Sequence, residues 1–155
     1  MRQLRTRPLT LEKISQAFPL IQAAFPEITL NAWRQFAEDR LLLEAPAQGG
    51  ILTVLCEQRY IAGLCSYRLE ADLLHGQALA VDLFVAYDMF DREAIANALV
   101  SGLETIARTN NCRATHTQLI ERRRNSIKTG LLAMLTRSGH KLERIRRWKH
   151  LRLSV

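Results

Sequence analysis

The most constraining feature of this 155-residue sequence is a long amphipathic pattern that directly follows an apolar strand. Residues 78–85 read ALAVDLFV, a run rich in strand-forming side chains. After a short polar turn, apolar residues recur with helical spacing at Ala94, Ile95, Ala98, Leu99, Gly102, Leu103, Ile106 and Ala107. Residues 113–120, RATHTQLI, then predict a further strand. Strand, long helix and strand together predict a crossover between two parallel strands.

The rest of the chain predicts an α/β domain with a mixed sheet. Residues 51–57 and 60–70 favour strands and are separated by two residues, which is typical of a hairpin. No internal repeat or flexible linker divides the chain, so residues 1–155 are expected to form a single domain. The other expected elements are a strand ending at Pro8, a helix capped by Thr10 and restarted at Pro19, a helix over 29–42, a helix between Asn125 and Gly139, and one or two strands over 141–155.

Composition limits the setting and the partners of the protein. The net charge of +7 suits nucleic acid, an anionic membrane surface or a polyanionic ligand such as coenzyme A. The basic segment 144–152 leaves a nucleic-acid role open, although an exposed strand is the favoured interpretation. The three cysteines form no C-x-x-C pair, so we expect reduced thiols in a cytoplasmic protein. No apolar run of about 18 residues occurs, and no membrane span is expected.

Several kinds of site have no sequence support. The chain has no G-x-S-x-G motif, no P-loop and no Rossmann glycine triplet, which disfavours hydrolase, NTPase and dinucleotide-enzyme interpretations. His75 and His116 belong to no H-E-x-x-H motif or carboxylate cluster. We therefore expect no metal site. For His116, a structural role is favoured over a catalytic one.

Two further motifs and the order of elements resemble the GNAT superfamily of acetyl-coenzyme A-dependent N-acyltransferases. Residues 56–67, CEQRYIAGLCSY, place Gly63 in the strand that follows a short turn. Residues 136–144, TRSGHKLER, contain Arg137 followed two positions later by Gly139. The resemblance implies a mixed, mostly antiparallel sheet with helices on both faces. It also implies acetyl-coenzyme A as co-substrate without a metal, an amine acceptor on a small molecule or peptide, and a homodimer as a common state.

The resemblance implies a cofactor site with a degenerate pyrophosphate motif. In the family this motif is Arg or Gln, two residues, Gly, one residue, then Gly or Ala. Here Ala96 fits, Ala94 replaces the first glycine, and Asp91 replaces the Arg or Gln. The implied contacts are the backbone of Leu83, Phe84 and Val85 with pantetheine, the amides of Phe90, Asp91, Arg92, Glu93, Ala94, Ile95 and Ala96 with pyrophosphate, and Asn125 with the pantetheine arm. Arg122, Arg123, Arg124 and Lys128 would contact the 3′-phosphate. The alternative interpretation of 91–96 is a helix capped by Asp91, with no ligand.

Acyl transfer to an amine needs a base, and Asp82 is the candidate. It is the one acidic residue in 78–85, and regular alternation predicts that it shares a face with Ala80 and Phe84. The alternative is a structural ion pair with an arginine. The family's tyrosine acid corresponds to Leu135, which has no hydroxyl. Two functions therefore stay open: an acetyl-coenzyme A-dependent N-acetyltransferase, or a GNAT-fold binding or regulatory protein that has lost catalysis.

Overall fold

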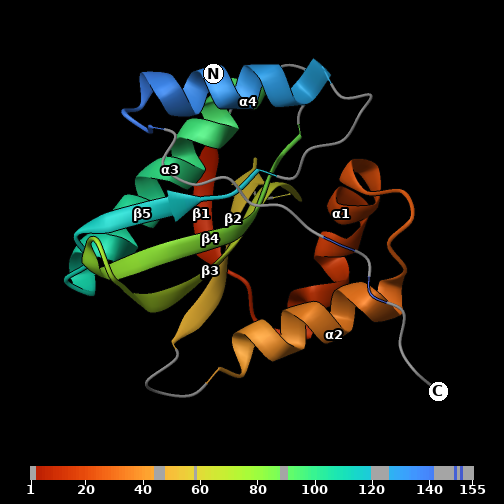
Figure 1. Cartoon of the computed structure of the whole chain (residues 1–155). Helices are drawn as coiled ribbons and strands as arrows, with labels where there is room; N and C mark the ends of the chain where they lie inside the picture. The colour runs from red at the N-terminus through yellow and green to blue at the C-terminus, as the bar shows by residue number, and fades with distance from the viewer. Residues whose placement is uncertain are drawn as a thin grey trace.

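The computed structural model describes residues 3–43, 48–57, 59–87, 91–119, 126–141, 149 and 151, with only the backbone of 126–130. One five-stranded sheet forms the centre of this part of the chain (Figure 1). Neighbouring strands are antiparallel from β1 to β4, whereas β5 runs parallel to β4. In spatial order the strands are β1 (Leu4–Pro8), β2 (Gly49–Cys56), β3 (Tyr60–Asp72), β4 (Gly76–Ala86) and β5 (Ala114–Thr117).

Helices cover both faces of this sheet (Figure 1). One face packs against the 3₁₀ helix η1 (Leu11–Ala17), α1 (Phe18–Ala24) and α2 (Leu30–Leu41). The other face packs against α3 (Arg92–Thr109) and α4 (Ser126–Arg137). These findings confirm the predicted mixed, mostly antiparallel sheet and the parallel crossover through the long helix. None of the helices in the described ranges is long and apolar enough to cross a membrane.

Most of the predicted helix boundaries are confirmed, with one difference at Thr10. Pro19 lies in the first turn of α1, where its missing N–H costs no helical hydrogen bond, so the helix restarts there as predicted. Thr10 precedes η1 but its side chain makes no capping hydrogen bond, whereas Thr29 accepts one from Ala32 at the start of α2. Gly139 follows α4 with a φ of +92°, as expected for a helix-terminating glycine. The strands predicted over 141–155 fall almost wholly outside the described residues.

Two glycines allow α3 to lie close to the sheet. A Cβ on Gly63 of β3 would stand 2.5 Å from Ile95 Cγ2 and 3.2 Å from Leu99 Cδ1. A Cβ on Gly102 of α3 would stand 2.6 Å from Leu52 Cδ2 of β2. The first contact fixes the position of the first turns of α3 over the sheet. Gly63, noted from the sequence as a motif residue, therefore has a packing role here.

A β-bulge interrupts β4 at Asp82. Ser66 pairs with Leu83 and Tyr67 with Val81, so Asp82 has no partner in the register of β3 and β4. The bulge breaks the alternation of side chains. Leu83, next to Asp82, packs in the cluster under α1 and α2, whereas Phe84 packs on the α3 face. The prediction that Asp82 and Phe84 share a face is therefore wrong, because regular alternation does not continue through a bulge.

Candidate functional site

Among the described strands, β5 leaves the second half of the adjoining β4 edge unpaired. β5 pairs with β4 only from Ala78 to Val81, and the last contact on this edge is a 2.9 Å hydrogen bond donated by the Gln118 N–H to the Val81 carbonyl. From residue 82 to 86 no described strand pairs with this edge. An unpaired edge offers backbone donors and acceptors to an extended ligand. Leu83, Phe84 and Val85, the residues implied to align pantetheine, lie in this open segment, and their side chains are buried.

The start of α3 lies beyond the end of this open segment and is capped by a carboxylate. Asp91 is the N-cap residue, and its Oδ1 accepts a 3.2 Å hydrogen bond from the Ala94 N–H. The predicted capping of this helix by Asp91 is thus confirmed. Because Asp91 uses one amide donor and adds negative charge, it opposes an anion at this helix end. Binding of a pyrophosphate by Arg92 to Ala96 stays a prediction, and Phe90 lies outside the described residues.

A second carboxylate in the first turn of α3 contacts the end of α4. Glu93 Oε1 lies 2.8 Å from Arg137 Nη2, and both side chains are more than half exposed. Arg137 belongs to the TRSGHKLER segment, so the fold brings this segment into contact with the predicted pyrophosphate motif. Asn125, Arg122, Arg123 and Arg124 lie outside the described residues, as does the side chain of Lys128.

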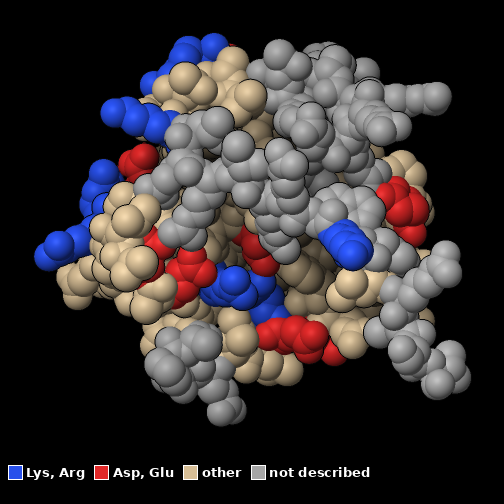
Figure 2. All heavy atoms as spheres, viewed as in Figure 1, with Lys and Arg blue, Asp and Glu red and all other residues tan. Residues whose placement is uncertain are grey.

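The predicted base, Asp82, forms an ion pair with Arg40 of α2. Arg40 Nη2 donates to Asp82 Oδ2, and the side chains are 10% and 28% exposed respectively. The guanidinium also lies over the Phe36 ring, 5.7 Å from its centroid. On the face viewed in Figure 2, acidic and basic side chains lie side by side near the middle. The alternative of an ion pair with an arginine is therefore confirmed as a contact.

This ion pair leaves hydrogen-bonding capacity unused. Asp82 Oδ1 and Arg40 Nε are both buried and have no hydrogen-bond partner among the described residues. A buried polar atom without a partner costs roughly 1–3 kcal/mol, so such atoms mark places where a further group can bind. Oδ1 can accept a hydrogen bond or a proton while Arg40 holds Oδ2.

The position implied for a tyrosine acid is apolar and buried. Leu135 is 4% exposed in the core beneath α4. Its carbonyl accepts a 3.0 Å hydrogen bond from the His140 N–H, and His140 Nδ1 lies 3.1 Å from the same oxygen. The backbone of Leu135 therefore holds the His140 imidazole at the end of α4. The Leu135 side chain itself has no hydroxyl that could act as the acid.

A second group of polar side chains gathers at the turn between β3 and β4. Asp72, His75 and His116 each offer one potential ligand atom, and these atoms lie within 4.8 Å of one another. His116 comes from β5, where it pairs with Ala80 of β4. The sequence spacing predicted no metal site, but the parallel pairing of β5 brings this histidine to the hairpin. Sequence reasoning missed the group because the register of β5 is not visible in the sequence.

Comparison with known proteins identifies the fold. No protein-family model matches the chain, and none of the curated proteins matches its sequence. An aminoglycoside N-acetyltransferase solved with coenzyme A superposes with a TM-score of 0.76 and 12% identity over 97% of this chain and 96% of its own. An aminoglycoside 6′-N-acetyltransferase from Acinetobacter baumannii gives a TM-score of 0.72 and 16% identity, covering 96% of this chain and 99% of its own.

A GNAT-family acetyltransferase from Staphylococcus aureus gives a TM-score of 0.71 and 16% identity, covering 97% of this chain and 100% of its own. Identities this low establish the fold and leave the chemistry to the residues of the chain itself. Each superposition covers nearly the full length of this chain and of the solved structure. The chain therefore has the fold of the GNAT acetyltransferases.

Proposed function

We propose that this protein transfers an acetyl group from acetyl-coenzyme A to an amine. The observation that carries the proposal is the open edge of β4 from residue 82 to 86, which ends near the start of α3. An extended pantetheine can pair with this edge as an added strand, and the amides at the start of α3 would then bind the pyrophosphate. A neighbour in fold was solved with coenzyme A, which supports the same class of co-substrate.

The reaction would proceed by direct attack of the amine on the thioester. The nitrogen lone pair forms a bond to the carbonyl carbon, the carbon–sulfur bond breaks, and coenzyme A leaves as a thiolate that takes up a proton. The amine must lose a proton, for which Asp82 Oδ1 is the candidate acceptor. Arg40 would act as a positioning residue by holding Oδ2. Asp82→Asn should lower kcat by roughly 100-fold or more with little change in the KM for acetyl-coenzyme A.

The acidic cap should weaken cofactor binding without preventing it. Asp91→Asn keeps the capping oxygen and removes the charge, because Asn and Asp cap helices about equally well. A charge at a helix end contributes about 0.3–1 kcal/mol, so this variant should bind coenzyme A roughly two- to fivefold more tightly. Calorimetric titration measures the change. Equal affinity for both proteins would show that the phosphates bind away from the start of α3.

The first experiment is thermal unfolding with and without millimolar acetyl-coenzyme A, with coenzyme A and ADP as further ligands. Free ligand at 100 times its dissociation constant adds about 2.7 kcal/mol, a shift of several degrees. A shift with acetyl-coenzyme A is the expected result and justifies an acceptor screen. The screen should include aminoglycosides, which two neighbours in fold acetylate according to their names, and peptide amines.

The second candidate is a GNAT-fold protein that binds a partner and has lost catalysis. The Asp91 carboxylate at the start of α3 favours it, because that charge opposes the pyrophosphate. Absence of any thermal shift with all three ligands would support this function over acetyl transfer. The same samples, measured by light scattering, test whether the protein forms the homodimer implied by the resemblance.

A further inference from the structure

We propose that Asp72, His75 and His116 form a binding site for a divalent transition-metal ion, with zinc the ion that suits the ligands best. Two imidazoles and one carboxylate are ordinary zinc ligands, and a site with three protein ligands keeps a fourth position for water. The proposal is independent of acetyl transfer. His116 pairs with Ala80, so the group lies toward the start of β4, whereas the open edge lies toward its end.

The positions of the three side chains are close to those of a bound state. Two imidazoles on one tetrahedral zinc, with zinc–nitrogen distances of about 2.0–2.1 Å, would have ring centroids about 5 Å apart. The rings of His75 and His116 have centroids 5.4 Å apart at an interplanar angle of 64°. Ligand atoms in such a site are about 3.3 Å apart. The three candidate atoms lie within 4.8 Å of one another, so side-chain rotations that move each atom by about 1 Å would bring them to the spacing of a bound ion.

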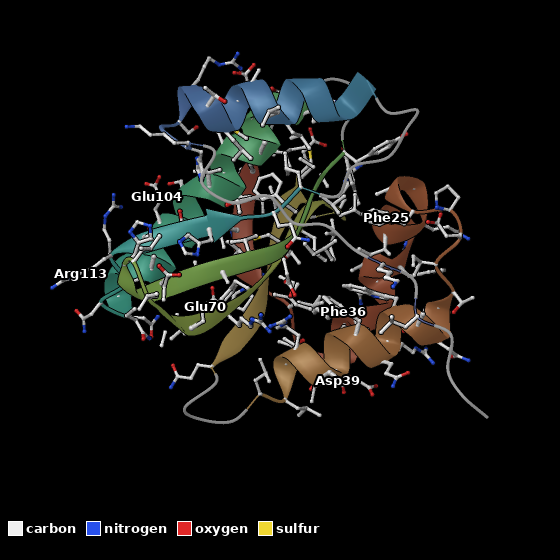
Figure 3. All side chains as sticks on the ribbon, viewed as in Figure 1. Phe25, Phe36, Asp39, Glu70, Glu104 and Arg113 are labelled. Atoms are coloured by element: carbon white, nitrogen blue, oxygen red, sulfur yellow. The ribbon has the colours of Figure 1, made fainter. Side chains whose placement is uncertain are left out.

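The surroundings supply the groups that commonly support a metal ligand. Glu70 Oε1 of β3 lies 3.7 Å from His116 Nδ1. Figure 3 shows Glu70 at this end of the sheet. The 3.7 Å distance is longer than a hydrogen bond, but a small shift on metal binding would let Glu70 accept a hydrogen bond from Nδ1–H and leave Nε2 for the metal. Asp72 is 8% exposed, and its Oδ2 accepts a 2.9 Å hydrogen bond from the His75 N–H, which sets the turn.

A metal ion here would link two segments of the sheet that share only a short stretch of backbone pairing. Asp72 and His75 belong to the β3–β4 turn, whereas His116 belongs to β5, which pairs with four residues of β4. The ion would therefore fasten the edge strand to the hairpin. Because the ligands are assembled only in the folded chain, zinc should stabilise the folded protein in proportion to its affinity.

The test uses the full chain without an affinity tag, because a histidine tag binds zinc itself. We expect one zinc per chain after loading and dialysis, and a visible absorption band from four-coordinate cobalt when cobalt replaces zinc. His75→Gln and His116→Gln should each weaken zinc binding by at least about tenfold and abolish the cobalt band. His140→Gln is the matched control, since His140 lies at the end of α4, and it should retain both.

Asp72→Asn separates a ligand from a turn-forming residue. The amide oxygen can still accept the hydrogen bond from the His75 N–H, so the metal-free variant should unfold at nearly the wild-type temperature. It should nevertheless lose most of the stabilisation by zinc. The proposal is overturned if wild-type protein retains no zinc, or if His75→Gln and His116→Gln retain as much zinc as His140→Gln. Equal stabilisation of wild type and Asp72→Asn by zinc would remove Asp72 from the site.

Discussion

The contact between Gly63 and α3 gives a prediction whose magnitude follows from the structure. In Gly63→Ala the new Cβ would stand 2.5 Å from Ile95 Cγ2, about 1 Å less than an ordinary carbon–carbon contact. Ile95 is 1% exposed, and its Cγ2 is attached directly to a branched Cβ, so it cannot move aside without the helix backbone. Overpacking of this kind costs about 1–3 kcal/mol. For a chain of this length that lowers the Tm by roughly 2–12 °C.

Gly102→Ala is the matched control, because its nominal clash is nearly the same. The new Cβ would stand 2.6 Å from Leu52 Cδ2, which is the end of a side chain that can rotate. Alanine inside a helix also gains about 0.5–1 kcal/mol over glycine. We therefore expect the free energy of unfolding of this variant to lie within about 1 kcal/mol of wild type.

Urea unfolding of Gly63→Ala, Gly102→Ala, Ile95→Ala and the double variant Gly63→Ala/Ile95→Ala tests this reasoning. Ile95→Ala removes the atom that clashes, so it should cost less in the Gly63→Ala background than alone, with a coupling of about 0.5–3 kcal/mol. If Gly63→Ala is as stable as Gly102→Ala, or if the two substitutions are additive, α3 is not held against β3 as described.

Three further predictions concern charges and thiols. Arg40→Ala leaves the Asp82 carboxylate partly buried without its cation and should cost about 1–3 kcal/mol in urea unfolding, but clearly less in an Asp82→Ala background; equal costs would contradict the pairing. Asp91→Ala should cost about 0.5–2 kcal/mol through loss of the N-cap, whereas Asp91→Asn should cost almost nothing, and similar losses would refute the capping role. Burial raises the pKa of the Cys65 thiol above its ordinary 9.0, so the unfolded chain loses this proton at a lower pH than the folded chain. Above about pH 9 the free energy of unfolding of the wild type should therefore fall with pH more steeply than that of Cys65→Ala, by about 1.4 kcal/mol per pH unit.

The sequence was sufficient for most of the fold because its signals there are local. The apolar stripe of α3, the restart at Pro19 and the glycine after α4 each act within a few residues, so neither strand order nor partner choice was needed to see them. The bulge at Asp82 was not visible. Residues 83–86 are apolar whichever face they occupy, since both faces of β4 are covered by helices.

The candidate site was predictable in part, for the same physical reason. Capping of α3 by Asp91 depends on neighbours three residues away, and the sequence indicated it. The partner of Asp82 did not follow, because nothing local distinguishes Arg40 from the other basic residues of the chain. The group at His116 did not follow either, since its members meet only through the pairing of β5 with β4.

Because Asp82 lies in a bulge, its side chain can serve the candidate site without taking part in the pairing of β3 and β4. In the register of β3 and β4 every neighbour of residue 82 has a cross-strand partner, but residue 82 has none. Exchanging its side chain therefore alters no paired position, and the strands on either side keep their alignment. Deleting residue 82 would remove the bulge and make Val81 and Leu83 adjacent opposite Tyr67 and Ser66, with both side chains still on the faces they occupy now. The register of the sheet therefore does not need residue 82, and what the extra residue adds is a carboxylate that contacts Arg40 from an unpaired position of β4.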